Sequence, residues 1–158
     1  MSDRWVFLTA FLTVVLIVAG AFVIPEFFAY ELAKSLIYLA IALLVFFGED
    51  RFSYMLGIVV PPLWFILNIL LGEFFGDFRV LFGFVTGKPS RPMDTPLHGF
   101  SLLMEILLVV LCVRVWRKQV SEKFFGKTFG ICLAIAIAYV AILAGWHFGT
   151  ITGTGRFH

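Results

Sequence analysis

The sequence predicts an all-α protein: a polytopic bundle of five transmembrane helices, with a short amphipathic segment in the interface between the third and fourth spans. Three observations predict this fold: of 158 residues, 61% are hydrophobic, only 14% are charged, and the mean hydropathy is +1.03. A soluble domain carries about 25% charged residues, and one core of this size cannot bury so many apolar side chains. The composition therefore excludes a soluble enzyme and a nucleic-acid-binding domain, and it makes the lipid bilayer a partner of the chain.

The apolar residues fall into five runs within one predicted transmembrane domain, residues 1–158. A spanning helix needs about 20 mainly apolar residues, and the runs that approach this length are residues 5–24, 32–47, 52–71, 97–116 and 128–148. The first run exceeds the roughly 7–15 residues of a signal-peptide core, so we expect it to remain as a helix. The second is the shortest, and Glu49, Asp50 and Arg51 close it.

The third run contains two adjacent prolines, Pro61 and Pro62. Each lacks an N–H and clashes with the preceding turn, so we expect a kink whose freed carbonyls need another partner in lipid. Broken helices of this kind line binding sites in transporters, and a pocket opened there would lie towards Asn68. A kink with a purely structural role is the alternative.

Residues 72–96 form the longest loop and have two parts. In the first, apolar residues recur at helical spacing among charged residues, which predicts a short amphipathic helix in the membrane interface; they are Phe74, Phe75, Phe78, Leu81, Phe82 and Val85. The glycines of this segment weaken a helix, and a re-entrant turn is the alternative. In the second, the prolines between residues 88 and 96 predict irregular structure. Loops of this length are often lids or binding loops, and a linker lying on the lipid is the alternative interpretation.

Basic residues set the expected orientation. The densest positive cluster consists of Arg114, Arg117, Lys118, Lys123 and Lys127, and such clusters stay on the cytoplasmic side of a membrane. Counting spans outward from this cluster predicts a cytoplasmic N-terminus, with residues 72–96 and the C-terminus on the outside.

Few polar side chains fall inside the five runs. A charged group in the middle of a bilayer costs at least about 2.5 kcal/mol, so such residues are expected to face the interior of the bundle. The candidates for a polar pocket are Asn68, His98, Glu105, Tyr139 and His147. His98 and Glu105 stand nearly two helical turns apart, so they share one face of the fourth span.

The last two runs are joined by a short connection, so we expect them to pack side by side as an antiparallel hairpin. With the turn centred near Glu122, His98 would lie level with His147, and Glu105 would lie beside the level of Tyr139. This match in depth is the main functional indication in the sequence.

Two histidines at one depth allow three interpretations. Imidazoles on neighbouring helices can ligate a haem b, so His98 and His147 are candidate ligands of haem or another planar cofactor. The same pair with Asp94 or Glu105 would suit a divalent metal, although the sequence has no zinc-protease or carboxylate–histidine motif. Alternatively, both rings lie at the membrane interface with their nitrogens in water.

Glu105 lies about 12 Å inside its span by helix rise, where an acid is either a proton carrier or a structural hydrogen-bond donor. Three functions remain open. The chain could be a subunit of a larger membrane complex that holds haem, quinone or another planar cofactor between the last two spans. It could be a small transporter or proton-conducting protein that uses Glu105. It could also be a membrane enzyme acting on a lipid or quinone at the outer leaflet.

Partners other than lipid are expected within the membrane, either other membrane subunits or further copies of the chain. The last run carries small residues at helical spacing, a pattern that suits the close approach of another helix. They are Ala134, Ala138, Ala141 and Gly145.

Overall fold

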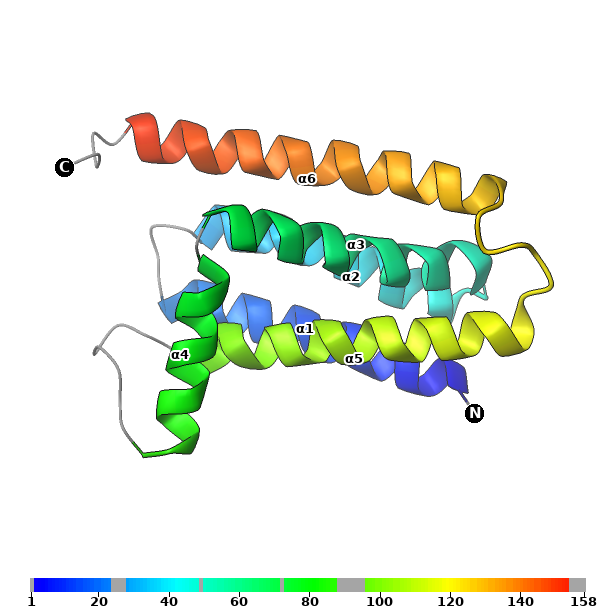
Figure 1. Cartoon of the computed structure of the whole chain (residues 1–158), viewed down its shortest axis with the longest axis horizontal. Coiled ribbons are helices and arrows are strands. Elements are labelled where there is room, and N and C mark those ends of the chain that lie inside the picture. The colour runs from blue at the N-terminus through cyan, green and yellow to red at the C-terminus, as the bar shows by residue number, and fades with distance from the viewer. Residues whose placement is uncertain (1, 24–27, 49, 72, 88–95, 154–158) are drawn as a thin grey trace.

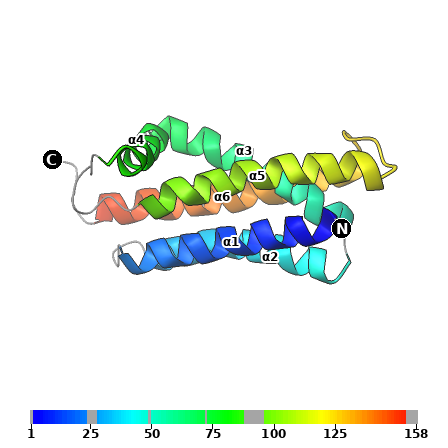
Figure 2. The ribbon, with the colours of Figure 1, turned by 90° about the horizontal axis from the view of Figure 1, so that it is seen from below.

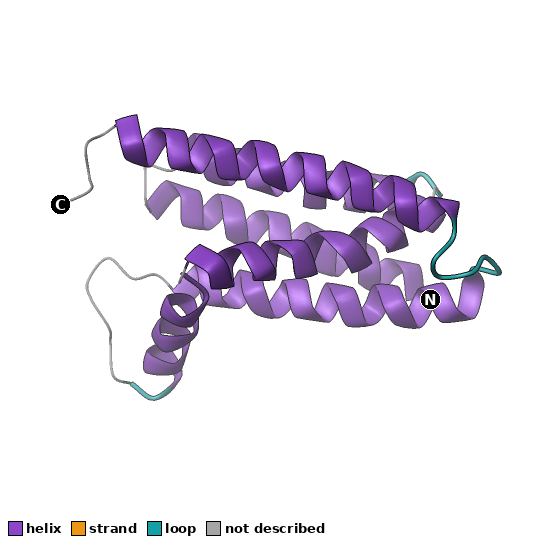
Figure 3. Ribbon diagram, turned by 45° about the horizontal axis from the view of Figure 1, so that its top comes forward, coloured by secondary structure: helices purple, strands orange, loops and turns teal. Residues whose placement is uncertain are grey.

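The computed structural model describes residues 2–23, 28–48, 50–71, 73–87 and 96–153. Within these ranges every regular element is a helix (Figure 3). The helices are α1 (Ser2–Val23), α2 (Phe28–Phe46), α3 (Asp50–Leu71), α4 (Glu73–Val85), α5 (Pro96–Gln119) and α6 (Lys127–Gly153).

All of these helices except α4 are long and apolar enough to cross a membrane. The predicted all-α bundle of five spanning helices is therefore confirmed, and the chain is a multi-pass membrane protein. The boundaries differ most at the end of α6, which reaches Gly153 rather than residue 148, and at the start of α2, which begins at Phe28 rather than near residue 32. The first turns of α2 therefore include Glu31 and Lys34. Both side chains are buried between helices.

Four helices enclose the core of the bundle. α1 packs on α2, α2 on α3 and α3 on α5, and α5 closes the ring against α1 (Figures 1 and 2). α6 lies outside this ring and contacts α3 and α2. In α3 61% of the spanning segment is buried, against 22% in α6, so α3 is the central helix and α6 is peripheral.

The bundle has two distinct ends. The N-terminus and residues 120–126 lie at one end, whereas α4 lies at the other, together with the last turns of α1, α3 and α6 and the first turns of α2 and α5 (Figure 1). We call these the N-terminal end and the α4 end. Every spanning helix runs from one end to the other, so position along a helix gives depth in the bundle.

The expected packing of α5 against α6 is wrong. These helices make no contact with each other, because α3 lies between them. Cys112 of α5 packs on Gly57, and Cys132 of α6 lies 3.9 Å from the carbonyl oxygen of Phe52, so α3 touches both. An extended chain covers up to roughly 3.5 Å per residue. Residues 120–126 are therefore long enough to pass α3 and reach its far side.

α4 is the amphipathic helix expected after the third span. It lies across the α4 end at a steep angle to the other helices (Figure 1) and packs on α3 and α5. Leu81 is 7% exposed, whereas Phe75 and Phe82 are each 70% exposed. This division of the surface suits a helix lying in the plane of the membrane interface. The proline-rich stretch expected to be irregular, residues 88–95, lies outside the described residues.

Polar contacts fasten the N-terminal end. The hydroxyl of Tyr54 donates a hydrogen bond of 2.7 Å to Asp3, which links α3 to α1. Arg51 and Thr128 both donate to Glu122, at 2.6 Å and 2.7 Å. These two bonds lower the pKa of the Glu122 carboxyl, with the Thr128 bond the larger cause. The connection between α5 and α6 is thereby tied to α3 and to the start of α6.

Candidate functional site

A polar face of α2 points into the α4 half of the bundle. The buried residues of this helix follow a spacing of three and four, which is the inward stripe of an amphipathic helix. The stripe begins with polar residues and continues with apolar ones; they are Glu31, Lys34, Ser35, Tyr38, Ile41, Ala42 and Val45, together with Ile37. The first half of α2 therefore presents ionisable groups to the core and the second half presents hydrocarbon.

Glu31 and Lys34 form an ion pair one turn apart on α2. Their nearest charged atoms are 3.9 Å apart, and the side chains are only 11% and 10% exposed. The ammonium group of Lys34 also lies 5.0 Å from the centre of the Trp64 ring on α3, a cation–π contact. A buried charge is tolerated when such partners surround it, so the Glu31 carboxylate and the Trp64 ring together suit a charged lysine inside the bundle.

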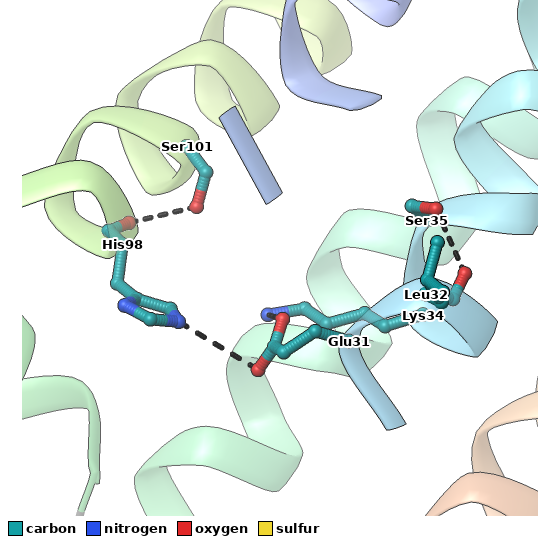
Figure 4. Close-up of polar contacts among 6 residues, drawn as sticks. All are labelled: Glu31, Leu32, Lys34, Ser35, His98 and Ser101. Carbon is teal, nitrogen blue, oxygen red and sulfur yellow. Dashed lines mark hydrogen bonds and ion pairs between the residues drawn. The ribbon is translucent and has the colours of Figure 1, made fainter. Parts of the chain in front are cut away.

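His98 brings α5 to the same cluster. Its Nε2 lies 3.6 Å from the carboxylate of Glu31 (Figure 4). This separation is longer than a hydrogen bond, so the contact is electrostatic and strongest when the imidazole is protonated. The hydroxyl of Ser101 donates to the backbone carbonyl of His98 at 2.8 Å, which fixes the first turn of α5. The imidazole also packs on Gly20 of α1.

Glu105 and Tyr38 continue the cluster towards the middle of the bundle. Both side chains are almost completely buried, with 1% exposed for each residue. The Tyr38 hydroxyl interacts electrostatically with three polar side chains. The interaction with Glu105 is the strongest, followed by those with Tyr139 and Glu31. The hydroxyl makes no hydrogen bond of good geometry with the described part of the chain. Its contact with Glu105 is therefore a close electrostatic one. Glu105 lies about 13 Å along α5 from Pro96 by helix rise.

The remaining sequence candidates have different surroundings. The hydroxyl of Tyr139 donates a hydrogen bond to the backbone carbonyl of Ala33, which ties α6 to α2. Asn68 is buried on α3, one turn beyond Trp64. His147 lies in α6, but its side chain is outside the described part of the structure. Since α3 separates α5 from α6, these helices do not form the hairpin that was expected to bring His98 and His147 together.

The structure therefore gathers His98 and Glu105 with residues that sequence reasoning missed: Glu31, Lys34, Tyr38 and Trp64. One signal could have found the first two. A run of residues 32–47 gives a helix of only about 24 Å, whereas the hydrocarbon core is about 30 Å thick. Extending the helix to Phe28 supplies the missing turn, brings Glu31 into the span and moves Lys34 from the first turn of the helix to its second.

The cluster is limited to half of the bundle. Beyond Tyr38 and Glu105, the next inward residues are Ile41, Leu108 and Cys112, all of them 0% exposed. The polar side chains buried near this level in the described part of the chain are Thr13 and Thr9 of α1, and the Thr13 hydroxyl donates to the Thr9 carbonyl at 2.9 Å. The next polar contact between helices is that of Tyr54 at the N-terminal end. The interior thus has an ionisable half that begins at the α4 end, and it is closed by a section lined by Ile41, Leu108 and Cys112, which we call the apolar section.

The cluster contains titratable groups but no assembled metal site. Among the residues that the structure describes, no three His, Cys, Asp or Glu side chains are grouped closely enough to hold a metal ion. Comparisons of the chain with protein-family models, with curated proteins and with solved structures found no match. The chemistry of the cluster therefore provides the basis for a functional proposal.

Proposed function

We propose that the chain is a small proton-conducting membrane protein in which Glu105 is the proton acceptor inside the membrane. The observation that carries the proposal is the contact of titratable side chains from two spanning helices. His98 lies 3.6 Å from Glu31 near the α4 end, and Tyr38 lies beside Glu105 deeper in the same interior. Intramembrane acids are rare because they are costly, and two in one small bundle indicate a use for them.

The proposed route needs no atoms beyond these side chains and water. The side chain of His98 is 19% exposed, so it can take a proton from water at the α4 end and give it to the Glu31 carboxylate. The Tyr38 hydroxyl can accept that proton while donating its own to Glu105. Lys34 stays charged beside Glu31 and offsets its negative charge.

The apolar section beyond Glu105 controls the second half of the route. Ile41, Leu108 and Cys112 separate Glu105 from the polar contacts of Tyr54. Conduction across the whole membrane requires this section to open, as in alternating-access transport. We place the α4 end on the outer face of the membrane and the N-terminus in the cytoplasm, because the basic residues between 114 and 127 lie at the N-terminal end.

Proton flux in liposomes tests the proposal. Protein reconstituted with an internal pH dye should dissipate a pH gradient, and Glu105→Gln should slow that flux by more than about tenfold because glutamine carries no exchangeable acid proton. The matched control is Glu122→Gln, which removes an exposed carboxylate outside the spans and should leave the flux unchanged. Equal flux in the Glu105→Gln protein would reject the proposal.

A role as a subunit of a larger complex, or as a homo-oligomer, is a second candidate supported by the surface of α6. Its small residues lie on the exposed side of the helix: Ala134, Ala138, Ala141 and Gly145. A Cβ added at Gly145 would meet nothing within 4 Å. Such stripes allow close packing of helices in membranes, and in the isolated chain nothing packs against it at Gly145.

Chemical cross-linking in native membranes tests this second candidate. Cross-linked species should form with the natural chain and be lost with Ala138→Phe, which fills the stripe. The control is Ala138→Ser, which changes the same position but leaves the stripe unfilled. Loss with both variants, or with neither, would argue against contact through the stripe.

A further inference from the structure

A groove runs along α5 in the N-terminal half of the bundle. It has a volume of about 400 Å³, and its lining residues are Val109, Val110, Val113, Arg114, Arg117 and Lys118. The valines lie on the side of the membrane middle, and the basic residues lie in the last turns of α5, which ends at Gln119. From Val109 to Lys118 the helix rises about 14 Å. The groove therefore joins hydrocarbon depth to the membrane interface.

The basic side chains of the groove are available to a ligand. Arg114, Arg117 and Lys118 are exposed, and none forms an ion pair with another residue in the described ranges. Arg51, at the same end of the bundle, is by contrast paired with Glu122 at 2.6 Å. The groove thus combines three positive charges that no described carboxylate offsets with an apolar wall directly beneath them.

We propose that this groove binds one anionic phospholipid, with its phosphate held by Arg114, Arg117 and Lys118 and an acyl chain lying along the valines. Guanidinium groups match phosphate oxygens in pairs of hydrogen bonds, and basic pockets on membrane proteins bind anionic headgroups. Only an amphiphile uses both parts of the groove. A free phosphate would leave the valines without a ligand, and a water-soluble protein would not reach them within the hydrocarbon layer.

The proposal is independent of the proton route, because the groove lies on the outer face of α5 whereas the route lies in the interior of the bundle. It must be separated from a general attraction of anionic lipid to the positive end of the bundle. Lys123 and Lys127 make this possible, because both are exposed at the same end and neither lines the groove. Removing these two lysines or the two arginines takes away the same number of charges.

The test uses the full chain in phosphatidylcholine nanodiscs that contain either spin-labelled phosphatidylglycerol or spin-labelled phosphatidylcholine. We expect selective immobilisation of the phosphatidylglycerol. In Arg114→Gln/Arg117→Gln this selectivity should weaken by about fivefold for each charge removed, and in Lys123→Gln/Lys127→Gln it should be retained. Val113→Trp, which fills the groove and keeps every charge, should also weaken it.

Three results would overturn the proposal. Equal loss of selectivity in the arginine and lysine double variants would show a diffuse charge effect. Unchanged selectivity in Arg114→Gln/Arg117→Gln or in Val113→Trp would show that the groove is not the site. Displacement of the labelled lipid by millimolar inorganic phosphate would identify a phosphate site that does not require lipid. Thermal unfolding of each variant establishes that it is folded, and the exposed arginines are expected to be dispensable for folding.

Discussion

The imidazole of His98 packs against α1 at Gly20, where an added Cβ would be crowded. A Cβ added at Gly20 would lie 3.3 Å from Cε1 of the ring, closer than the roughly 3.5–4.0 Å of a normal carbon contact. Nε2 of the same ring lies 3.6 Å from the Glu31 carboxylate. Glycine at position 20 therefore allows α1, α2 and α5 to meet at one imidazole.

Gly20→Ala should destabilise the bundle by about 1 kcal/mol, because the added methyl group overpacks the contact with His98. The same substitution in a His98→Ala background should cost much less, so the two changes should be coupled in a double-mutant cycle. The measurement is unfolding by SDS in mixed micelles. Gly145→Ala is the control, since its added Cβ meets nothing within 4 Å. Additive effects of the Gly20 and His98 substitutions would contradict the contact.

A tighter contact of the same kind joins α3 to α5. A Cβ at Gly57 would lie 2.5 Å from Sγ of Cys112, so Gly57→Ala should cost about 1–3 kcal/mol of unfolding free energy. Cys112→Ala removes the clashing sulfur, and the double variant should recover most of that loss. Gly130→Ala, at an open position on α6, is the matched control and should be nearly neutral. Failure of Cys112→Ala to rescue Gly57→Ala would show that the backbone, not the sulfur, sets the limit.

The number and type of helices could be predicted because lipid imposes a minimum length on each apolar run. The order in which helices pack could not, because apolar faces are nearly interchangeable partners. Cys112 and Cys132 illustrate this limit. Both lie in the N-terminal half of the bundle, and each touches α3 from a different helix.

The polar site was predictable only in part for a related reason. Glu105 could be recognised because an acid in the middle of an apolar run has no other explanation than an interior position. Glu31 and Lys34 stand near the end of their run, where a charge is equally compatible with a loop. Their burial depends on Trp64 and His98, which come from two other helices, and no local pattern predicts such a meeting.

Glu31→Gln should destabilise the bundle by about 3 kcal/mol, because it removes the carboxylate that lies 3.9 Å from the buried ammonium of Lys34. Glu31→Gln/Lys34→Met removes both charges and should recover most of the loss. Arg51→Gln is the control: its pair with Glu122 is exposed to water, so the free energy of unfolding should barely change. A neutral effect of Glu31→Gln on SDS unfolding would mean that the carboxylate does not stabilise Lys34.

Glu122 makes the attachment of the connecting segment sensitive to acid. Hydrogen bonds from Thr128, the larger cause, and Arg51 lower the pKa of its carboxyl. A group whose pKa is lowered by folding stabilises the folded state above its unfolded pKa, about 4.3 for glutamate. That contribution is lost as the pH falls below 4.3 and through the lowered value. We therefore expect residues 120–126 to stay attached at neutral pH and to loosen only in acid.

Carbon-13 NMR of protein labelled at the glutamate carboxyls measures this pKa directly, with Glu122→Gln identifying the resonance. The midpoint should lie below the ordinary value of about 4.3. Thr128→Val keeps the shape of the side chain but removes its donor, so it should return the midpoint towards that value by more than Arg51→Gln does, in keeping with the order of the two causes. A midpoint at the ordinary value in the unmodified protein, or no response to Thr128→Val, would mean that the two hydrogen bonds do not hold the carboxylate in solution.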